Sequence, residues 1–109
     1  MGTRENKVEV YLRNEIKKIT GDTRKWVSPG RNGVPDQIIF LRGHVCFCEV
    51  KTTDGVIEIA QEREHRRLRK LGCIVTVVYG HKGVDKLIAD IVENSFQPNP
   101  LFKLRGVYK

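Results

Sequence analysis

The chain has 109 residues, of which 39% are hydrophobic and 30% charged, so it has room for one domain around one core. This composition excludes a disordered chain, and no run approaches the ~20 apolar residues that a membrane span requires. Twenty Lys and Arg against thirteen Asp and Glu give a net charge of +7, which favours a polyanionic partner such as nucleic acid. The N-terminus lacks the apolar run of a signal peptide, so we expect a cytoplasmic protein.

Apolar spacing and turn-forming residues divide the chain into helices and strands. Val8, Leu12 and Ile16 recur at helical spacing ahead of Gly21, and the later apolar runs are short and bounded by turn formers. In chain order we predict a helix over 5–19, a short strand near 26–27, a loop over 28–33, a strand over 36–41, a turn at 42–43, a strand over 44–52, a helix over 57–71, a strand over 73–79 and a helix over 84–93. This order predicts an α/β fold with helices flanking a mixed sheet.

Three segments carry specific expectations for the core. The strand over 44–52 has apolar groups on both faces, so it should be central. The segment 94–109 is a tail that could pad the core, pair with a partner chain or follow a phosphate backbone. We treat 1–109 as a single domain with its core over 5–93. The side chains expected to point inward from the last two helices are Ile57, Ala60, Leu68, Leu71, Val84, Leu87, Ile88, Ile91 and Val92.

The three cysteines are expected to be free thiols in the core, because their number is odd and they form no CxxC framework. His44, Cys46 and Cys48 alternate along one predicted strand face and could be offered as zinc ligands. Zinc sites, however, need four tetrahedral donors and usually a looped spacing. Buried thiols are therefore the better interpretation of Cys46, Cys48 and Cys73.

Glu49 and Lys51 are two residues apart on the predicted central strand. The two-residue period of a strand directs both side chains to the same side of the sheet, where Val45 and Phe47 also lie. Charged groups on an apolar strand face are costly to bury unless something compensates them. A carboxylate and an amine facing one pocket therefore indicate a functional site, with a structural ion pair as the alternative.

Asp36 begins the strand that precedes this one. If the turn centres near Gly43, Glu49 lies roughly opposite position 37, so Asp36 falls within one residue of being its cross-strand neighbour. Two carboxylates this close repel each other unless they are protonated or bridged by a cation, and oxygen ligands suit Mg²⁺ or Mn²⁺. Such an ion would polarise a phosphodiester and activate a water, and Lys51 could orient that water or neutralise charge at phosphorus.

The segments Gly33-Val34-Pro35-Asp36 and Glu49-Val50-Lys51, followed by Gln61, resemble the PD-(D/E)XK nuclease superfamily and more narrowly its VRR-NUC (virus-type replication-repair nuclease) domain. The resemblance covers about residues 5–79. It implies a restriction-endonuclease-like αβββαβ core with a mixed central sheet flanked by helices, plus a C-terminal helix and tail. Further residues that match the family pattern are Lys25, Trp26, Val27, Ser28, Pro29, Gly30, His65, Leu68 and Gly72.

The resemblance also implies roles for individual residues. Asp36, Glu49 and the backbone carbonyl of Val50 would be metal ligands. Lys51 would be the catalytic lysine, and Gln61 would reach the site from its helix. For Gln61 the alternative is a glutamine that caps a strand end or meets solvent.

The family also places a glutamate on the first helix, and Glu9 matches that position as a ligand and catalytic residue. On a helical projection Glu9 lies just beyond Ile16 at the edge of the apolar stripe, whereas Glu5 projects within the stripe, so either could reach inward. The chain departs from the family at Glu58-Ile59, where a serine cap and a proline are usual. We expect an altered helix entry and no loss of chemistry.

Two basic segments are candidates for contact with nucleic acid. Five cations fall within eight positions of the predicted helix over 57–71, which is either a solvated face or a set of phosphate contacts. The loop with Ser28 and Arg31 precedes Asp36 and is placed to touch the scissile strand, with an ordinary hairpin loop as the alternative. The helix cations are Arg63, Arg66, Arg67, Arg69 and Lys70.

The sequence therefore predicts an Mg²⁺- or Mn²⁺-dependent DNA endonuclease. Stand-alone members of the family resemble junction resolvases, so by analogy we expect a homodimer that acts on branched DNA such as four-way junctions. We expect neither a membrane partner nor an organic cofactor. The alternatives are a basic nucleic-acid-binding module without catalysis and a sequence-specific restriction-type endonuclease.

Overall fold

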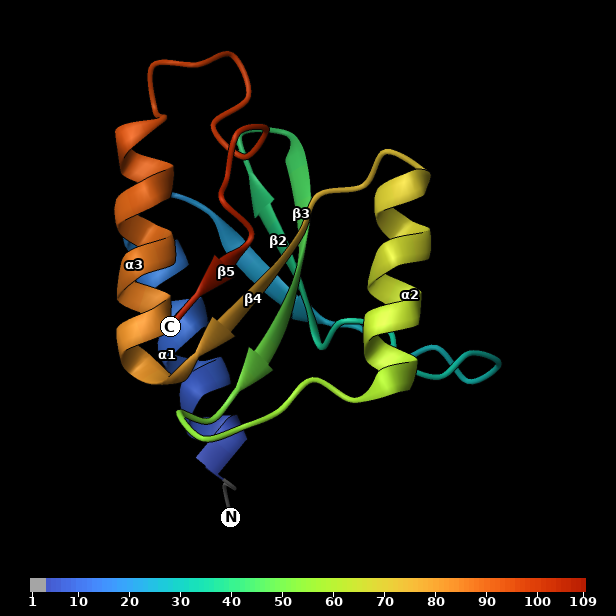
Figure 1. Ribbon diagram of the computed structural model, residues 1–109. Helices are drawn as coiled ribbons and strands as arrows, with labels where there is room; N and C mark the ends of the chain where they lie inside the picture. The colour runs from blue at the N-terminus through green and yellow to red at the C-terminus, as the bar shows by residue number, and fades with distance from the viewer. Residues whose placement is uncertain (1–3) are drawn as a thin grey trace.

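The computed structural model describes residues 4–109, which form three helices and five strands around one mixed sheet (Figure 1). The strands follow chain order across the sheet; β1, β2 and β3 are antiparallel, and β3, β4 and β5 are parallel. The predicted α/β fold with a mixed sheet and flanking helices is confirmed. The elements are α1 (Arg4–Lys18), β1 (Asp22–Lys25), β2 (Gln37–Leu41), β3 (His44–Lys51), α2 (Ile59–Lys70), β4 (Val75–Tyr79), α3 (Gly80–Glu93) and β5 (Val107–Tyr108).

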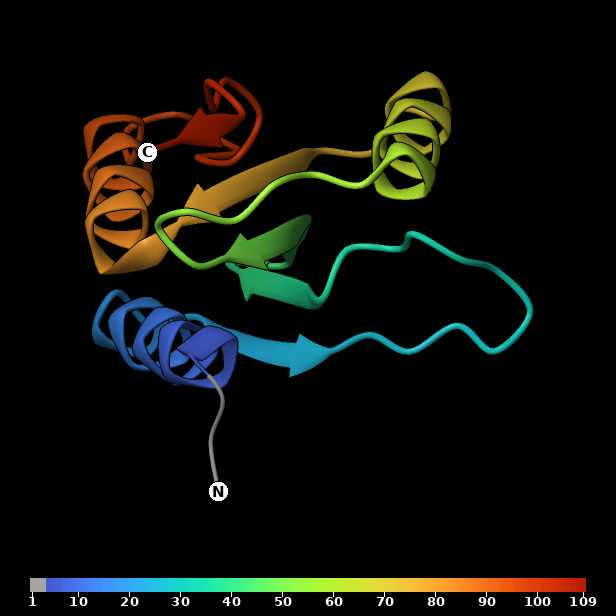
Figure 2. The same ribbon diagram turned by 60° about the horizontal axis from the view of Figure 1, so that its bottom comes forward.

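The helices divide unequally between the two faces of the sheet. Figure 2 shows α1 and α3 side by side on one face and α2 on the other, where the loop between β1 and β2 also projects. The main core lies between the sheet and the α1–α3 pair. Among residues 4–109, no helix combines the length and apolar character that a bilayer crossing needs. The fully buried members of this core include Leu12, Ile16, Ile39, Cys46, Cys48, Val50, Val78, Val84 and Leu87.

The turn between β2 and β3 fixes the register that positions the site. Arg42 and Gly43 have φ angles of 53° and 78°, the left-handed pair of a type I′ two-residue hairpin turn. Gln37 therefore pairs with Cys48, and the prediction that Glu49 lies opposite position 37 is wrong by one residue. The turn centres between the two residues and not on Gly43. Continuing the ladder by one step places Asp36 directly opposite Glu49.

The apolar stripe predicted for the second helix is largely wrong. Ala60 and Leu71 are exposed, Ile57 is half-buried ahead of the helix, and only Leu68 of the four is buried. The face of β3 that contacts α2 carries charged side chains, so the helix packs on it with polar side chains instead of an apolar stripe. The residues that α2 buries are Glu64, His65 and Leu68.

Two element boundaries and the orientation of one side chain also differ from the sequence prediction. The first strand covers Asp22–Lys25, whereas Trp26 follows it and stacks on Phe47 with ring centroids 4.8 Å apart. The last helix begins at Gly80, four residues before the predicted start, because the left-handed φ of 66° at this glycine turns the chain directly out of β4. Val92 is exposed and not directed inward.

The C-terminal segment packs onto its own chain. Leu101 and Tyr108 are buried, and β5 adds to the edge of the sheet beside β4. The Tyr108 hydroxyl donates a hydrogen bond to Asp90 of α3, and the backbone N–H of Arg105 donates one to the same carboxylate at 3.1 Å. Of the three alternatives left open by the sequence, padding of the core is the one observed.

Candidate active site

Asp36 lies immediately ahead of β2, at the point where the loop enters the sheet. Its Oδ2 accepts a hydrogen bond of 3.1 Å from the backbone N–H of Val50 on β3. The preceding Pro35 is buried, which anchors the end of the loop. The aspartate is thus attached to the strand that carries the second acidic residue.

Glu49 and Lys51 lie on the face of β3 that meets α2, as the strand period predicts. Their side chains are close: Lys51 Nζ is 3.5 Å from Glu49 Oε2. Both residues are buried, with exposed fractions of 1% for Glu49 and 8% for Lys51. A buried charge without a partner would be strongly unfavourable, so this pair needs the further contacts supplied by α2.

Gln61 supplies those contacts from the first turn of α2. Its Oε1 accepts a hydrogen bond of 2.9 Å from Lys51 Nζ, and its Nε2 donates one of 2.9 Å to Glu49 Oε2. The same Oε1 accepts from the backbone N–H of Glu58 at 2.9 Å, so one side chain both caps the helix start and joins the site. Gln61 therefore reaches the acidic strand, and the solvent-facing alternative is wrong.

Gly33 allows the loop before Asp36 to approach the start of α2. A Cβ atom at this position would lie 2.3 Å from the carbonyl oxygen of Ala60, and the φ angle is +85°. Both constraints require glycine. The close approach fixes the first turn of α2, and hence Gln61, relative to the loop that delivers Asp36.

The electrostatics of the site disfavour a negative charge on Glu49 when no cation is present. Burial, followed by the nearby charge of Asp36, raises the pKa of Glu49 to about 8, although Lys51 acts in the opposite direction. Glu49 Oε1 is buried and has no hydrogen-bond partner within residues 4–109. Two adjacent carboxylates, one with a free buried oxygen, fit a divalent cation bound by oxygen ligands.

Glu9 projects from α1 and contacts the face of the sheet opposite to the one that carries Glu49 and Lys51. Its Oε1 accepts hydrogen bonds from Gln37 Nε2 at 2.7 Å and from Lys25 Nζ at 3.2 Å. Gln37 shares the face of its partner Cys48, which is the α1 face, whereas Glu49 faces α2. Within residues 4–109, no group of three Asp, Glu, His or Cys side chains is clustered tightly enough to hold a metal. Glu5 is exposed, so Glu9 is the better placed of the two.

The cysteines lie apart from this site. Cys46 and Cys48 are free thiols buried on the α1 face, while Cys73 is free and half-buried. Burial raises the pKa of Cys46 to about 12 and also raises that of Cys48. His44 Nε2 lies 3.1 Å from the carbonyl oxygen of Pro98, so its ring is engaged with the C-terminal segment.

The basic residues of α2 and of the loop between β1 and β2 form one neighbouring surface. Arg31 and Arg67 both contact Glu64 Oε1, at 3.3 and 3.1 Å, which ties the loop to the helix. Arg63 lines the same hollow as Arg31 and Arg67, and Ser28 is half-buried at the base of the loop. Arg66 pairs with Glu62, and Arg69 donates to the Val75 carbonyl. Lys70 is exposed at the end of the helix.

Sequence reasoning gave no role to three buried polar residues around the site. Gln37 is the partner of Glu9, and Glu64 joins two arginines. His65 is buried with its Nε2 4.0 Å from Glu49 Oε1. His65 matches the family pattern in sequence, and Glu64 and His65 are three and four residues after Gln61, so helical spacing from a site residue is the signal that could have given them a role.

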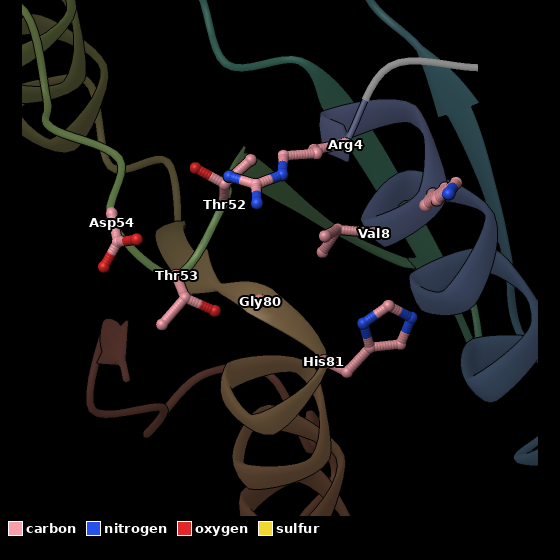
Figure 3. A pocket seen from close by; sticks show the side chains of 8 residues that line it. Arg4, Val8, Thr52, Thr53, Asp54, Gly80 and His81 are labelled. Carbon is pink, nitrogen blue, oxygen red and sulfur yellow. The ribbon is translucent and has the colours of Figure 1, made fainter.

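A separate cavity of about 480 Å³ opens beyond the C-terminal end of β3 (Figure 3). It lies between the start of α1, the segment that follows β3 and the start of α3. Neither Asp36 nor Glu49 lines it, so the acidic pair lies outside this cavity. The lining residues are Arg4, Lys7, Val8, Thr52, Thr53, Asp54, Gly80 and His81.

Known proteins resemble this chain both in sequence and in structure. No family model matches the chain. A protein of Acyrthosiphon pisum secondary endosymbiont phage 1, named "Putative nuclease p44", is 43% identical over 76 residues, which are 69% of this chain and 82% of that protein. A solved structure described as "VRR_NUC domain" superposes with a TM-score of 0.72 at 36% identity, covering 81% of this chain and 97% of that one.

Proposed function

Since the chain belongs to the VRR-NUC family of nucleases and is itself a nuclease, we propose that it is an Mg²⁺- or Mn²⁺-dependent DNA endonuclease. Nucleases with this PD-(D/E)XK-type fold generally use divalent metals. One observation carries the proposal: Asp36 and Glu49 are brought together across two strands beside Lys51, at a point where burial and mutual repulsion disfavour two negative charges. A divalent cation resolves that repulsion.

The metal would be held by Asp36, Glu49 and the backbone carbonyl of Val50, and Glu9 is proposed as a further ligand. Magnesium commonly takes one or two carboxylates and keeps several waters or substrate phosphates, so the acidic pair is a sufficient protein anchor. A bound ion would supply polarisation of the phosphodiester and a lowered pKa of the attacking water. Both hydrogen bonds that Gln37 and Lys25 donate to Glu9 end on Oε1, so Oε2 is the oxygen that would serve as the ligand.

Lys51 is proposed as the catalytic lysine. Its ammonium group is held beside Glu49 by the 2.9 Å hydrogen bond to Gln61 Oε1, so it is oriented before substrate arrives. In this position it orients the attacking water or neutralises charge that develops on the phosphate. Gln61 acts on the reaction by holding both Lys51 and Glu49, and we assign it to the site on that basis.

The proposed DNA-binding surface is the basic loop and helix beside the site. Ser28 and Arg31 come from the loop that delivers Asp36, and α2 adds exposed cations on the same side of the sheet. Glu64 neutralises part of this charge, but two arginines share it. Phosphate contacts of this kind position the backbone without reading sequence, which favours a structure-selective over a restriction-type enzyme. The helix residues are Arg63, Arg66, Arg67 and Lys70.

We propose a homodimer that acts on branched DNA such as four-way junctions. One domain of this size has little surface to enclose two strands, and two copies related by a twofold axis would present paired sites. An uncovered apolar strip supports self-association: Phe40 and Val45 are cross-strand partners on the α2 face and are 40% and 42% exposed. Phe102, also exposed, lines the hollow next to Val45.

A cleavage assay tests the proposal. Pure protein is incubated with junction, flap and duplex oligonucleotides in Mg²⁺, Mn²⁺ or EDTA, in parallel with Lys51→Ala and, as a matched loss of one cation, Arg13→Ala on the opposite helix layer. We expect metal-dependent cleavage that is lost in Lys51→Ala and kept in Arg13→Ala, with junctions preferred. Binding without cleavage in every metal would instead identify a non-catalytic module, and discrete plasmid fragments a restriction-type enzyme. Light scattering after size-exclusion chromatography gives the oligomeric state.

A further inference from the structure

His65 is a buried titratable side chain beside Glu49 that the proposed chemistry does not use. It projects from α2 one turn after Gln61 and is 2% exposed. Its Nε2 lies 4.0 Å from Glu49 Oε1. The imidazole therefore faces the carboxylate oxygen that Gln61 and Lys51 do not approach through their hydrogen bonds.

Both atoms of this contact are unsatisfied within residues 4–109. Glu49 Oε1 and His65 Nε2 are each buried without a hydrogen-bond partner, and they lie 4.0 Å apart. Buried polar atoms are nearly always paired, and leaving one unpaired costs about 1–3 kcal/mol. A separation of 4.0 Å is spanned by one bridging water or closed by a small side-chain shift. Either arrangement satisfies both atoms when the proton of the neutral imidazole is on Nε2.

We propose that His65 is a positioning residue that fixes Glu49 Oε1 through its Nε2–H. This inference rests on the proposed function, because it assigns Glu49 to the metal. Gln61 then holds Oε2 and His65 holds Oε1, so α2 grips both oxygens of one carboxylate from successive turns of the helix. A ligand oriented from both sides presents a fixed lone pair to the ion, and outer contacts of this kind commonly change metal affinity or activity 10–100-fold.

Direct metal binding by His65 is less well supported. Hard cations such as Mg²⁺ and Mn²⁺ prefer oxygen to imidazole nitrogen. The imidazole is therefore assigned to the carboxylate and not to the ion.

Two substitutions separate positioning from simple packing. His65→Leu keeps a similar buried volume and removes the N–H, whereas His65→Gln retains a donor at about the position of Nε2. Leu68→Ala is the matched control, because Leu68 is buried on the same face of α2 and makes no polar contact with the site. Each full-length variant is measured for Mn²⁺ affinity by isothermal titration calorimetry, for thermal unfolding, and for kcat and KM on a junction oligonucleotide.

We expect His65→Leu to weaken Mn²⁺ binding about tenfold or more and to lower kcat with KM for DNA little changed, and His65→Gln to stay within about threefold of wild type. Leu68→Ala should lower thermal stability and leave Mn²⁺ affinity unchanged. The inference is overturned if His65→Leu binds Mn²⁺ like wild type, or if Leu68→Ala weakens it equally. If wild type itself neither binds Mn²⁺ nor cleaves DNA, the proposed function fails, and this inference fails with it.

Discussion

The carboxylate of Asp36 accepts a hydrogen bond from the backbone N–H of Val50, which attaches the residue just ahead of β2 to the strand that carries Glu49 and Lys51. The bond has a charged acceptor, which makes it stronger than one between neutral groups. It also holds Asp36 opposite Glu49, where the two carboxylates repel each other until a cation is bound.

Asp36→Asn keeps an oxygen acceptor and removes the negative charge. We expect the fold to persist and both Mn²⁺ binding and cleavage to fall at least ~100-fold, because one of the two anchoring carboxylates is lost. Calorimetry and oligonucleotide cleavage measure the two effects. Asp54→Asn, an exposed acid in the segment after β3, is the control and should match wild type.

Gln61→Leu removes both hydrogen bonds that Gln61 makes to site side chains. Lys51 and Glu49 lose their shared partner, so kcat should fall about 10–100-fold with a smaller change in KM. Ile59→Ala, at an exposed position in the same turn, should leave steady-state kinetics unchanged. Equal kinetics for Gln61→Leu and Ile59→Ala would remove Gln61 from the site.

Glu49→Gln should stabilise the protein in EDTA while abolishing cleavage. The folded-state pKa of about 8 lies above the ordinary value of 4.5, so the folded state binds the proton more tightly than the unfolded state. The contribution of Glu49 to stability is therefore fully present below pH 4.5 and is lost as the pH rises through about 8, whereas the amide has no charge to bury. We expect an advantage of about 1–3 kcal/mol for Glu49→Gln at pH 9 and little at pH 5. Urea unfolding at the two pH values measures it, and an equal advantage at both would contradict this account.

Gly33→Ala should destabilise the protein by about 2 kcal/mol or more and also reduce activity. The new Cβ would meet the backbone of Ala60, and the φ of +85° disfavours a side chain. The first turn of α2 would have to move, and Gln61 would move with it. Gly30→Ala in the same loop is the matched control, because nothing lies within 4 Å of its Cβ position. Thermal unfolding and cleavage should separate the two variants clearly.

The double variant Arg63→Ala, Arg67→Ala should weaken DNA binding and flatten its dependence on salt. Each phosphate contact that is lost lowers the slope of log affinity against log salt concentration by about 0.9 for duplex DNA. Fluorescence anisotropy between 50 and 200 mM salt measures that slope. Arg13→Ala paired with Lys17→Ala removes the same charge from the exposed side of α1 and should leave the slope near that of wild type.

The sequence was sufficient to predict the strand that carries the site. Alternation along 44–51 places Glu49 and Lys51 on one face and the thiols on the other, and the hairpin brings Asp36 to Glu49. The one-residue error in register arose because the turn uses two left-handed residues, and only the φ angle of Arg42 reveals this. Strand alternation and hairpin pairing depend on residues close together in the chain, so this part of the structure could be predicted from the sequence.

The second helix was harder to predict, because apolar periodicity assumes that a helix buries apolar side chains. Here the face toward the sheet is built from Gln61, Glu64 and His65 with one leucine, and their partners come from other elements. The hydrogen bond between Gln37 and Glu9 was not predictable either. The two residues are 28 positions apart in the chain, and no local sequence pattern encodes their contact.

The unequal covering of the sheet divides the molecule into a firm half and an adjustable one. The α1–α3 layer packs on the sheet through aliphatic side chains. By contrast, α2 contacts β3 mainly through hydrogen bonds centred on Gln61. Water or a phosphate oxygen can replace such hydrogen bonds at a small cost in free energy. We therefore expect α2 to be the helix that moves when a DNA strand enters or leaves the site. The same helix would then both bind the DNA backbone and adjust its position to DNA substrates of different shape.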